Sequence, residues 1–90
     1  MPKWYDNCVV IRAGASSNQN ETEIFLTDRS TSPKFSEKAF IAADAVRKEL
    51  LAIALTAVTS GNRVDALVDD PLTPNTPQSL YALYLRNTST

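Results

Sequence analysis

Residues 47–70 read RKELLAIALTAVTSGNRVDALVDD, and this stretch decides the fold. Apolar residues recur in it at every third or fourth position as far as Val58, a spacing that lines them up along one side of an α-helix. Gly61 follows, where a helix commonly ends because glycine adopts the left-handed backbone conformation at no steric cost. Residues Arg63–Val68 then alternate like a half-buried strand. We therefore predict a helix that turns directly into a strand.

The expected helix carries two adjacent apolar rows. The first row consists of Val46, Leu50, Ala54 and Ala57, and the second of Leu51, Leu55 and Val58. A sheet covers one row, so the second row needs another packing partner. We predict that Leu51, Leu55 and Val58 form an oligomer interface.

The start of the helix has two interpretations. In the preferred one, Asp44 is the N-cap and its negative charge suits the positive end of the helix dipole, while Phe40 and Ile41 belong to a short strand. In the other, Ser36 caps a helix that runs on from Glu37 without a break, because no glycine or proline interrupts it.

Alternating apolar residues predict strands on both sides of the helix. The expected strands are Trp4–Ala13, which we expect to be buried on both faces, Glu23–Asp28, Lys38–Ile41, Arg63–Val68 and Ser79–Asn87. Turn-forming residues predict loops at Gly14–Glu21, Arg29–Ser36 and Asp70–Gln78. The order predicts one α+β domain over residues 1–90, a small five-stranded OB-type barrel with one long helix between strands three and four.

The run from Lys48 through Ala57, the Thr59-Ser60-Gly61-Asn62 hinge and the valine-rich strand that follows resemble a known family. Over Ala43–Leu85 the chain is similar to the B subunits of subtilase-cytotoxin and typhoid-toxin type, and to small bacterial proteins with the same hinge. The resemblance implies an OB-type fold, a ring of five subunits with helices lining its centre, strand pairing between neighbouring subunits, and glycan binding. The chain lacks the cysteine pair of those toxin subunits, and its first two strands match them only in pattern.

Composition weighs against catalysis. The chain has no histidine, which removes the Ser-His-Asp triad, Cys-His pairs and imidazole metal ligands. Two acidic clusters remain, Asp65, Asp69 and Asp70, and Glu21, Glu23 and Asp28. Strand ends rich in aspartate usually form turns. Asp69 and Asp70, with Thr73 and Asn75 nearby, could bind calcium through oxygen atoms, but they lack the glycine hinge and bidentate glutamate of an EF-hand loop. We expect no enzyme activity, no catalytic residue, no metal site and no cofactor.

The net charge and the single cysteine limit the kinds of partner that the sequence predicts. With 9 basic and 10 acidic residues the net charge is −1, so a nucleic-acid partner is disfavoured. Cys8 is expected to be a small buried residue, the alternatives being a reactive thiol or a bridge between subunits. The apolar run Leu50–Leu55 is too short to cross a membrane, and MPKWYDN at the start has no apolar signal segment, which suits a cytosolic chain or a mature secreted one.

Trp4, Tyr81 and Tyr84 are the candidate ligand-binding residues, because aromatic rings with a polar group stack on sugars and anchor interfaces. The alternation places Tyr81 and Tyr84 on opposite faces of the last strand, so at least one should lie in the core or an interface. The sequence thus predicts a non-enzymatic homo-oligomer, a pentamer by resemblance, with a glycan or protein partner. The alternatives are an OB-fold nucleic-acid-binding module and a small structural or assembly protein without a ligand.

Overall fold

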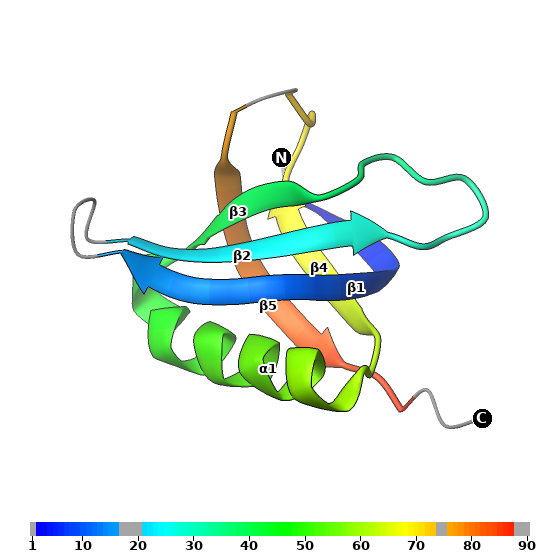
Figure 1. The fold of residues 1–90 in the computed structure, drawn as a ribbon. Helices are drawn as coiled ribbons and strands as arrows, with labels where there is room; N and C mark the ends of the chain where they lie inside the picture. Colours follow the sequence, from blue (N-terminus) through cyan, green and yellow to red (C-terminus); the bar gives the residue numbers. More distant parts are fainter. Residues whose placement is uncertain (1, 17–20, 74–75, 88–90) are drawn as a thin grey trace.

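The structure is a computed structural model that describes residues 2–16, 21–73 and 76–87. One helix lies between the third and fourth of five strands, as the sequence predicts (Figure 1). The elements are β1 (Pro2–Ser16), β2 (Glu21–Asp28), β3 (Lys38–Ala42), the short 3₁₀ helix η1 (Asp44–Val46), α1 (Arg47–Ser60), β4 (Val64–Asp69) and β5 (Gln78–Leu85).

The five strands form a closed barrel in the order β1-β2-β3-β5-β4. All neighbouring pairs are antiparallel except β3 and β5, which run parallel and pair only over Phe40–Ala42 and Gln78–Leu80. The short β3–β5 pairing closes the sheet on one side, and the pairing of β1 with both β2 and β4 closes it on the other. Each strand therefore has two neighbours over part of its length.

Strand β1 pairs with two different strands, β4 and β2, because it bends. Its first part, as far as Cys8, pairs with β4, while the part from Cys8 onward pairs with β2. The register shifts between Tyr5 and Cys8, where Asn7 has a φ of 62°, and again between Val10 and Arg12. Such bulges bend a strand and increase its twist, which closure of a small barrel requires.

The prediction that the first strand is buried on both faces is wrong. Cys8 and Val10 point into the core, but Ile11, the unpaired residue of the second bulge, is 37% exposed. One face of a barrel strand must look outward, and no element in the described ranges covers Ile11. The strand also extends beyond the predicted range, through Gly14–Ser16, which had been assigned to a loop. Residues 17–20 of that predicted loop lie outside the described residues.

Lys38–Ala42 form β3, so the short third strand is confirmed and the alternative of a continuous helix from Glu37 is wrong. Helical structure begins at Asp44, as predicted, but as the 3₁₀ turn η1. The predicted capping role of Asp44 is wrong, because Ala43 occupies the cap position and no side chain bonds the free amides. Asp44 instead forms an exposed ion pair with Arg47 one turn later.

The end of α1 follows the prediction. Gly61 is the C-cap, with a φ of 79°, and its N–H donates to the carbonyl of Ala57 at 2.8 Å. The first apolar row faces the barrel, since Leu50, Ala54 and Ala57 are buried. Figure 1 shows α1 lying across the barrel beneath β1 and β5, and its packing contacts with both strands fix it there.

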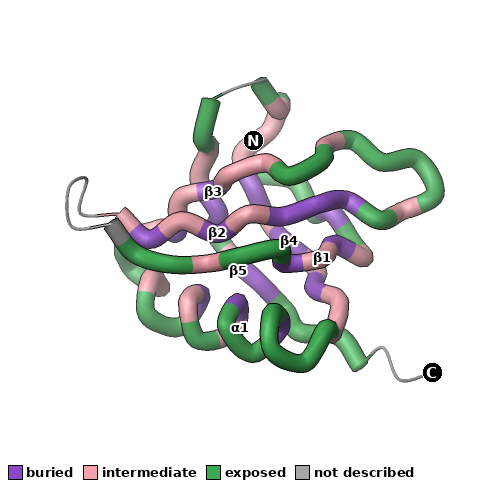
Figure 2. The backbone as a smooth tube through the Cα atoms, in the orientation of Figure 1, coloured by how far each residue is buried: buried purple, intermediate pink, exposed green. Residues whose placement is uncertain are grey.

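The core fills the barrel and the space under α1. Alternation in β2 and β4 gives each strand an inward face, shown as buried segments in Figure 2. The largest fully buried side chains are Phe40, Ile24, Leu26, Leu80, Leu83, Val64, Val68 and Cys8. Cys8 is buried and free, as expected, and its Sγ donates to the carbonyl oxygen of Tyr5.

No helix in the described ranges is long and apolar enough to cross a membrane.

Candidate ligand-binding surfaces

Two of the three candidate aromatic residues meet on the outside of the barrel. Trp4 on β1 and Tyr84 on β5 flank β4, where they pair with Leu67 and Asp65 respectively. Their ring centroids are 5.2 Å apart at an interplanar angle of 52°. Trp4 is 43% exposed and Tyr84 is 64% exposed. We call these two rings the aromatic pair, and it presents a tilted apolar surface to solvent.

The third candidate, Tyr81, has a different environment. Its hydroxyl donates to Oδ1 of Asp69 at 3.1 Å, and its ring is exposed. The sequence predicts Tyr81 and Tyr84 on opposite faces, with at least one in the core or an interface; neither ring lies in the core of the chain, and a place in an interface stays a prediction. Val68 pairs with Leu80 and Leu67 with Ala82, which leaves Tyr81 unpaired in a bulge. The bulge shifts the alternation by one residue, so that Leu80 and Leu83 are both buried.

The predicted interface residues lie along one side of α1. Leu51 is half-buried, while Leu55 is 48% exposed and Val58 is 41% exposed. The barrel of the same chain therefore covers the first apolar row and leaves most of the second row in contact with solvent.

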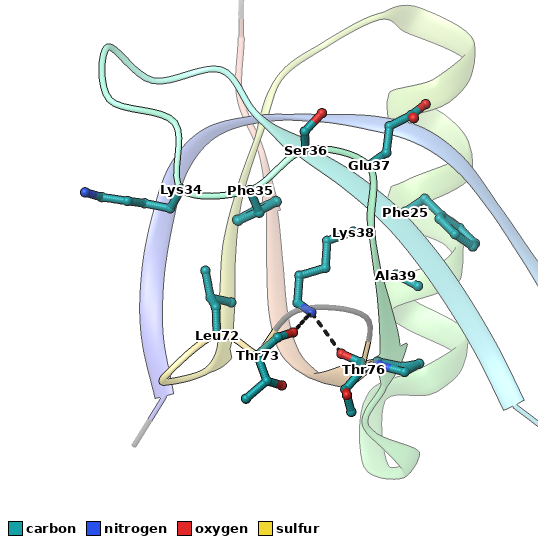
Figure 3. Close-up of a pocket in the computed structure, with 11 residues that line it drawn as sticks. Phe25, Lys34, Phe35, Ser36, Glu37, Lys38, Ala39, Leu72, Thr73 and Thr76 are labelled. Atoms are coloured by element: carbon teal, nitrogen blue, oxygen red, sulfur yellow. Dashed lines mark hydrogen bonds between the residues drawn. The ribbon is translucent and has the colours of Figure 1, made fainter.

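A pocket that the sequence did not predict lies between the β2–β3 loop, β3 and the β4–β5 loop. Its volume is about 540 Å³, and we call it the loop pocket. Phe35, Leu72, Phe25 and Pro77 give it apolar walls, and Lys34, Glu37 and Lys38 are its charged residues. In Figure 3 the side chain of Lys38 lies across the pocket with its ammonium group at one wall. Both loops were predicted as loops, but nothing local in the sequence shows that they converge.

Lys38 is held in the loop pocket by main-chain acceptors. Its Nζ donates to the carbonyl oxygens of Thr73 at 2.6 Å and Thr76 at 2.8 Å, and it lies 5.8 Å from the ring centre of Phe40. Burial lowers the pKa of Lys38 below its ordinary value of 10.5. The same ammonium therefore fastens the β4–β5 loop to β3.

Asp28 organises the other loop of the pocket. Its carboxylate accepts the backbone N–H groups of Ser30 at 2.9 Å and Lys34 at 2.8 Å. Burial alone would raise the pKa of Asp28, but these bonds, a bond from the Ser30 side chain and the nearby charge of Lys34 lower it below 3.8. The N–H of Asp28 donates to the carbonyl of Phe35 at 3.2 Å, which closes the loop.

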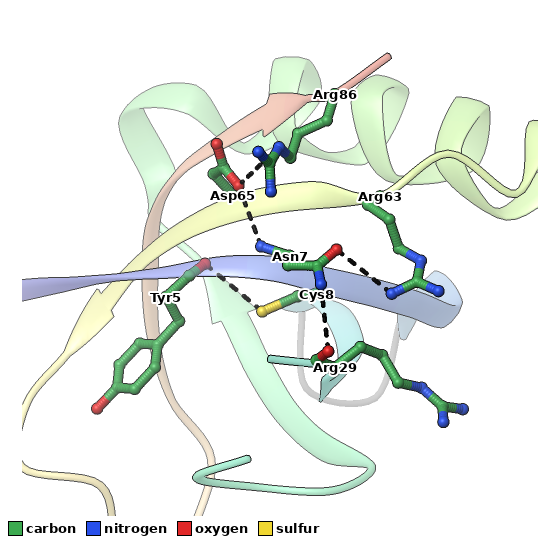
Figure 4. A network of polar contacts seen from close by, with 7 residues as sticks. All are labelled: Tyr5, Asn7, Cys8, Arg29, Arg63, Asp65 and Arg86. Carbon is green, nitrogen blue, oxygen red and sulfur yellow. Dashed lines mark hydrogen bonds and ion pairs between the residues drawn. The ribbon is translucent and has the colours of Figure 1, made fainter. Parts of the chain in front are cut away.

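A second group of polar contacts ties β1 to β4 and to the β2–β3 loop (Figure 4). The backbone N–H of Asn7 donates to Asp65, its Nδ2 donates to the carbonyl of Arg29, and its Oδ1 accepts from Arg63. Asp65 also pairs with Arg86 at 3.5 Å. We call this set the Asn7 network, and the bend of β1 lies at its centre.

Most members of the two acidic clusters have structural partners. Asp65 and Asp28 are engaged as described, Asp69 accepts from Tyr81, and Asp70 accepts from the hydroxyl of Tyr5 at 3.0 Å. Within the described ranges, no group of three or more acidic or cysteine side chains is arranged to hold a metal ion. The geometry therefore assigns these aspartates to turns and strand ends.

Comparison with protein-family models and with curated proteins finds no match to this chain.

Proposed function

We propose that the chain is a non-enzymatic binding module of OB type that assembles into a ring, in which α1 faces the centre and the aromatic pair binds a glycan. A five-stranded barrel with strand order 1-2-3-5-4 and a helix between strands three and four supports the OB-type interpretation. The ring of five is proposed only from the resemblance of the sequence pattern of residues 43–85 to toxin B subunits.

The observation that carries the proposal is a pair of incompletely paired strand edges. Among the described residues, β1 beyond Cys8 pairs only with β2, and β5 beyond Leu80 pairs only with β4. Unpaired edges of this kind readily add a strand from another chain. The two edges are different surfaces of one molecule, so joining one to the other is a head-to-tail contact, which generates a ring when the rotation closes.

Exposed apolar side chains accompany the two edges. Ile11 lies on the β1 edge and Leu85 on the β5 edge, and α1 packs against both strands. Leu55 and Val58 extend this apolar surface along α1. Burial of these side chains against a neighbour would stabilise the assembly by roughly 25 cal/mol for each Å² of apolar surface removed from water.

Assembly is tested by light scattering coupled to size exclusion, and by native mass spectrometry. We expect a mass several times that of one chain at micromolar concentration. Leu55→Asp and Leu85→Lys should each shift the mass toward the monomer, because a charge would enter an apolar contact. Thr31→Asp, at an exposed position of the β2–β3 loop, is the control and should assemble normally. A wild-type chain that stays monomeric would overturn the ring.

Glycan binding is tested separately with a glycan array. The two exposed rings of the aromatic pair offer faces on which the apolar side of a sugar can stack. Trp4→Ala and Tyr84→Ala should abolish binding, whereas Tyr81→Phe should keep it, because that change removes only the hydroxyl bonded to Asp69. Binding that survives both alanine substitutions would show that the aromatic pair is not the site.

A further inference from the structure

The ammonium group of Lys38 is bound by main-chain carbonyl oxygens of the β4–β5 loop. Two of the three ammonium donors are used by the carbonyls of Thr73 and Thr76, which are neutral. In the described part of the chain, no carboxylate forms an ion pair with Lys38. Both bonds lie at an exposed position of the pocket, so the third N–H donor of Lys38 is accessible and can form a charge-assisted hydrogen bond with an anion.

The walls of the loop pocket select for an apolar body next to that anion. Phe35 packs edge-on against Tyr5 and against Phe40, with centroid distances of 5.5 Å and 5.4 Å, so its ring is held from two sides. Leu72 and Pro77 complete an apolar wall. A volume of about 540 Å³ lies within the range of small-molecule sites, roughly 300 to 1,000 Å³.

The net charge of the lining also favours an anion. Two lysines, Lys34 and Lys38, and one glutamate, Glu37, line the pocket, which leaves one positive charge in excess. The side chain of Lys34 is exposed at the rim, where it can attract an anion without holding it (Figure 3). Asp28 is absent from the lining, but its carboxylate lies near enough to Lys34 to offset part of the charge of that lysine, so Lys38 is the main positive charge available to an anion inside the pocket.

We propose that the loop pocket binds an organic carboxylate attached to a compact apolar group such as one aromatic ring. The carboxylate accepts the remaining donor of Lys38, and the ring packs against Phe35 and Leu72. This site goes beyond the proposed function, since neither the aromatic pair nor any residue of α1 lines it. The result of its test is therefore independent of ring assembly and of glycan binding.

The test is a calorimetric titration of the wild-type chain with 3-phenylpropionate as the probe. Two compounds separate the contribution of the carboxylate charge from that of the aromatic ring. The amide 3-phenylpropionamide keeps the ring and shape without the charge, and acetate keeps the charge without the ring. We expect 3-phenylpropionate to bind, the amide to bind at least about tenfold more weakly, and acetate to give no detectable heat. Equal affinity for acid and amide, or no binding of the acid at millimolar concentration, would overturn the proposal.

Two variants locate the site. Lys38→Met should weaken binding of 3-phenylpropionate by about tenfold or more, and Lys34→Gln should have a smaller effect. Lys48→Met, on the exposed side of α1, is the matched control and should bind like wild type. Because Lys38→Met also removes two bonds to the β4–β5 loop, the acid-to-amide ratio is measured in it as well. That ratio should fall to near one, and an unchanged ratio would show that Lys38 is not the anion contact.

Discussion

Asn7 sits where β1 bends, with a left-handed backbone and three partners that belong to other elements. Asparagine tolerates this conformation better than most residues, and its amide both donates and accepts. The carbonyl of Asn7 also accepts the N–H of Arg29 at 3.1 Å. One residue thereby links the bend of β1 to β4 and to the start of the β2–β3 loop.

We predict that Asn7→Ala lowers the free energy of unfolding by about 2 to 3 kcal/mol, because it removes two side-chain hydrogen bonds and puts alanine, which tolerates positive φ less well than asparagine, at this position. Asn7→Gly should cost only about 1 kcal/mol, since glycine accepts that φ and loses the hydrogen bonds alone. Urea denaturation of both variants measures the difference. Equal losses would mean that backbone conformation contributes little at this position.

At the scale of the element, the sequence predicted best where a local pattern decides the outcome. The apolar period of α1, its end at Gly61 and the alternation of β4 depend on neighbours along the chain, and the structure confirms all three. The bulges at Asn7, Ile11 and Tyr81 were not predicted, because the register of a strand is set by its partner and not by its own residues.

The same distinction applies to the candidate surfaces. Trp4 and Tyr84 could be selected as aromatic residues, but only the pairing of β1 and β5 with β4 brings them together. The loop pocket could not be predicted, because the contact of Lys38 with Thr73 and Thr76 joins segments far apart in the sequence. The alternation that predicted opposite faces for Tyr81 and Tyr84 is interrupted by the bulge at Tyr81, which depends on the pairing of β5 with β4.

The end of α1 provides a test at this scale. Gly61→Ala should lower the unfolding free energy by roughly 1 to 2 kcal/mol, through the left-handed backbone alone, because a Cβ there would meet no atom within 4 Å. Gly14→Ala is the matched control, since its Cβ also meets nothing within 4 Å and its φ is not positive. It should be neutral or stabilise β1 by up to about 1 kcal/mol. Thermal unfolding of both variants measures the effects, and similar melting temperatures would contradict the capping role.

For the whole molecule, buried titratable groups predict how stability changes with pH. Burial, with Asp28, Asp65 and Asp6 nearby, raises the pKa of Cys8 from 9.0 to about 12. Burial, with the hydrogen bond to Asp70 and the charges of Asp70 and Asp28, raises that of Tyr5 from 10.0 to about 12. Between the ordinary and the raised pKa values, Cys8 and Tyr5 keep their protons in the folded chain, whereas they have lost them in the unfolded chain. Alkali therefore favours the unfolded state.

We predict that these two groups leave the free energy of unfolding unchanged below pH 9 and lower it between pH 9 and pH 12. At the acid end the sign reverses for Asp28, whose lowered pKa contributes stability that is lost as pH falls below 3.8. Denaturation measured across pH checks both limbs. Cys8→Ala should flatten the alkaline limb and Asp28→Asn the acid limb, and an unchanged slope in either variant would assign that limb to other groups.

The division of β1 between two partners has a consequence for how the polypeptide is made. The first strand leaves the ribosome early, yet residues 2–5 pair with Ala66–Asp69, which are synthesised much later. The β1–β2 hairpin can form during translation, but the N-terminal half of β1 must wait with its backbone groups in water until β4 emerges. Closure of the barrel is thus a late event governed by contacts distant in the sequence, the kind that slows folding and lengthens exposure to proteases and chaperones.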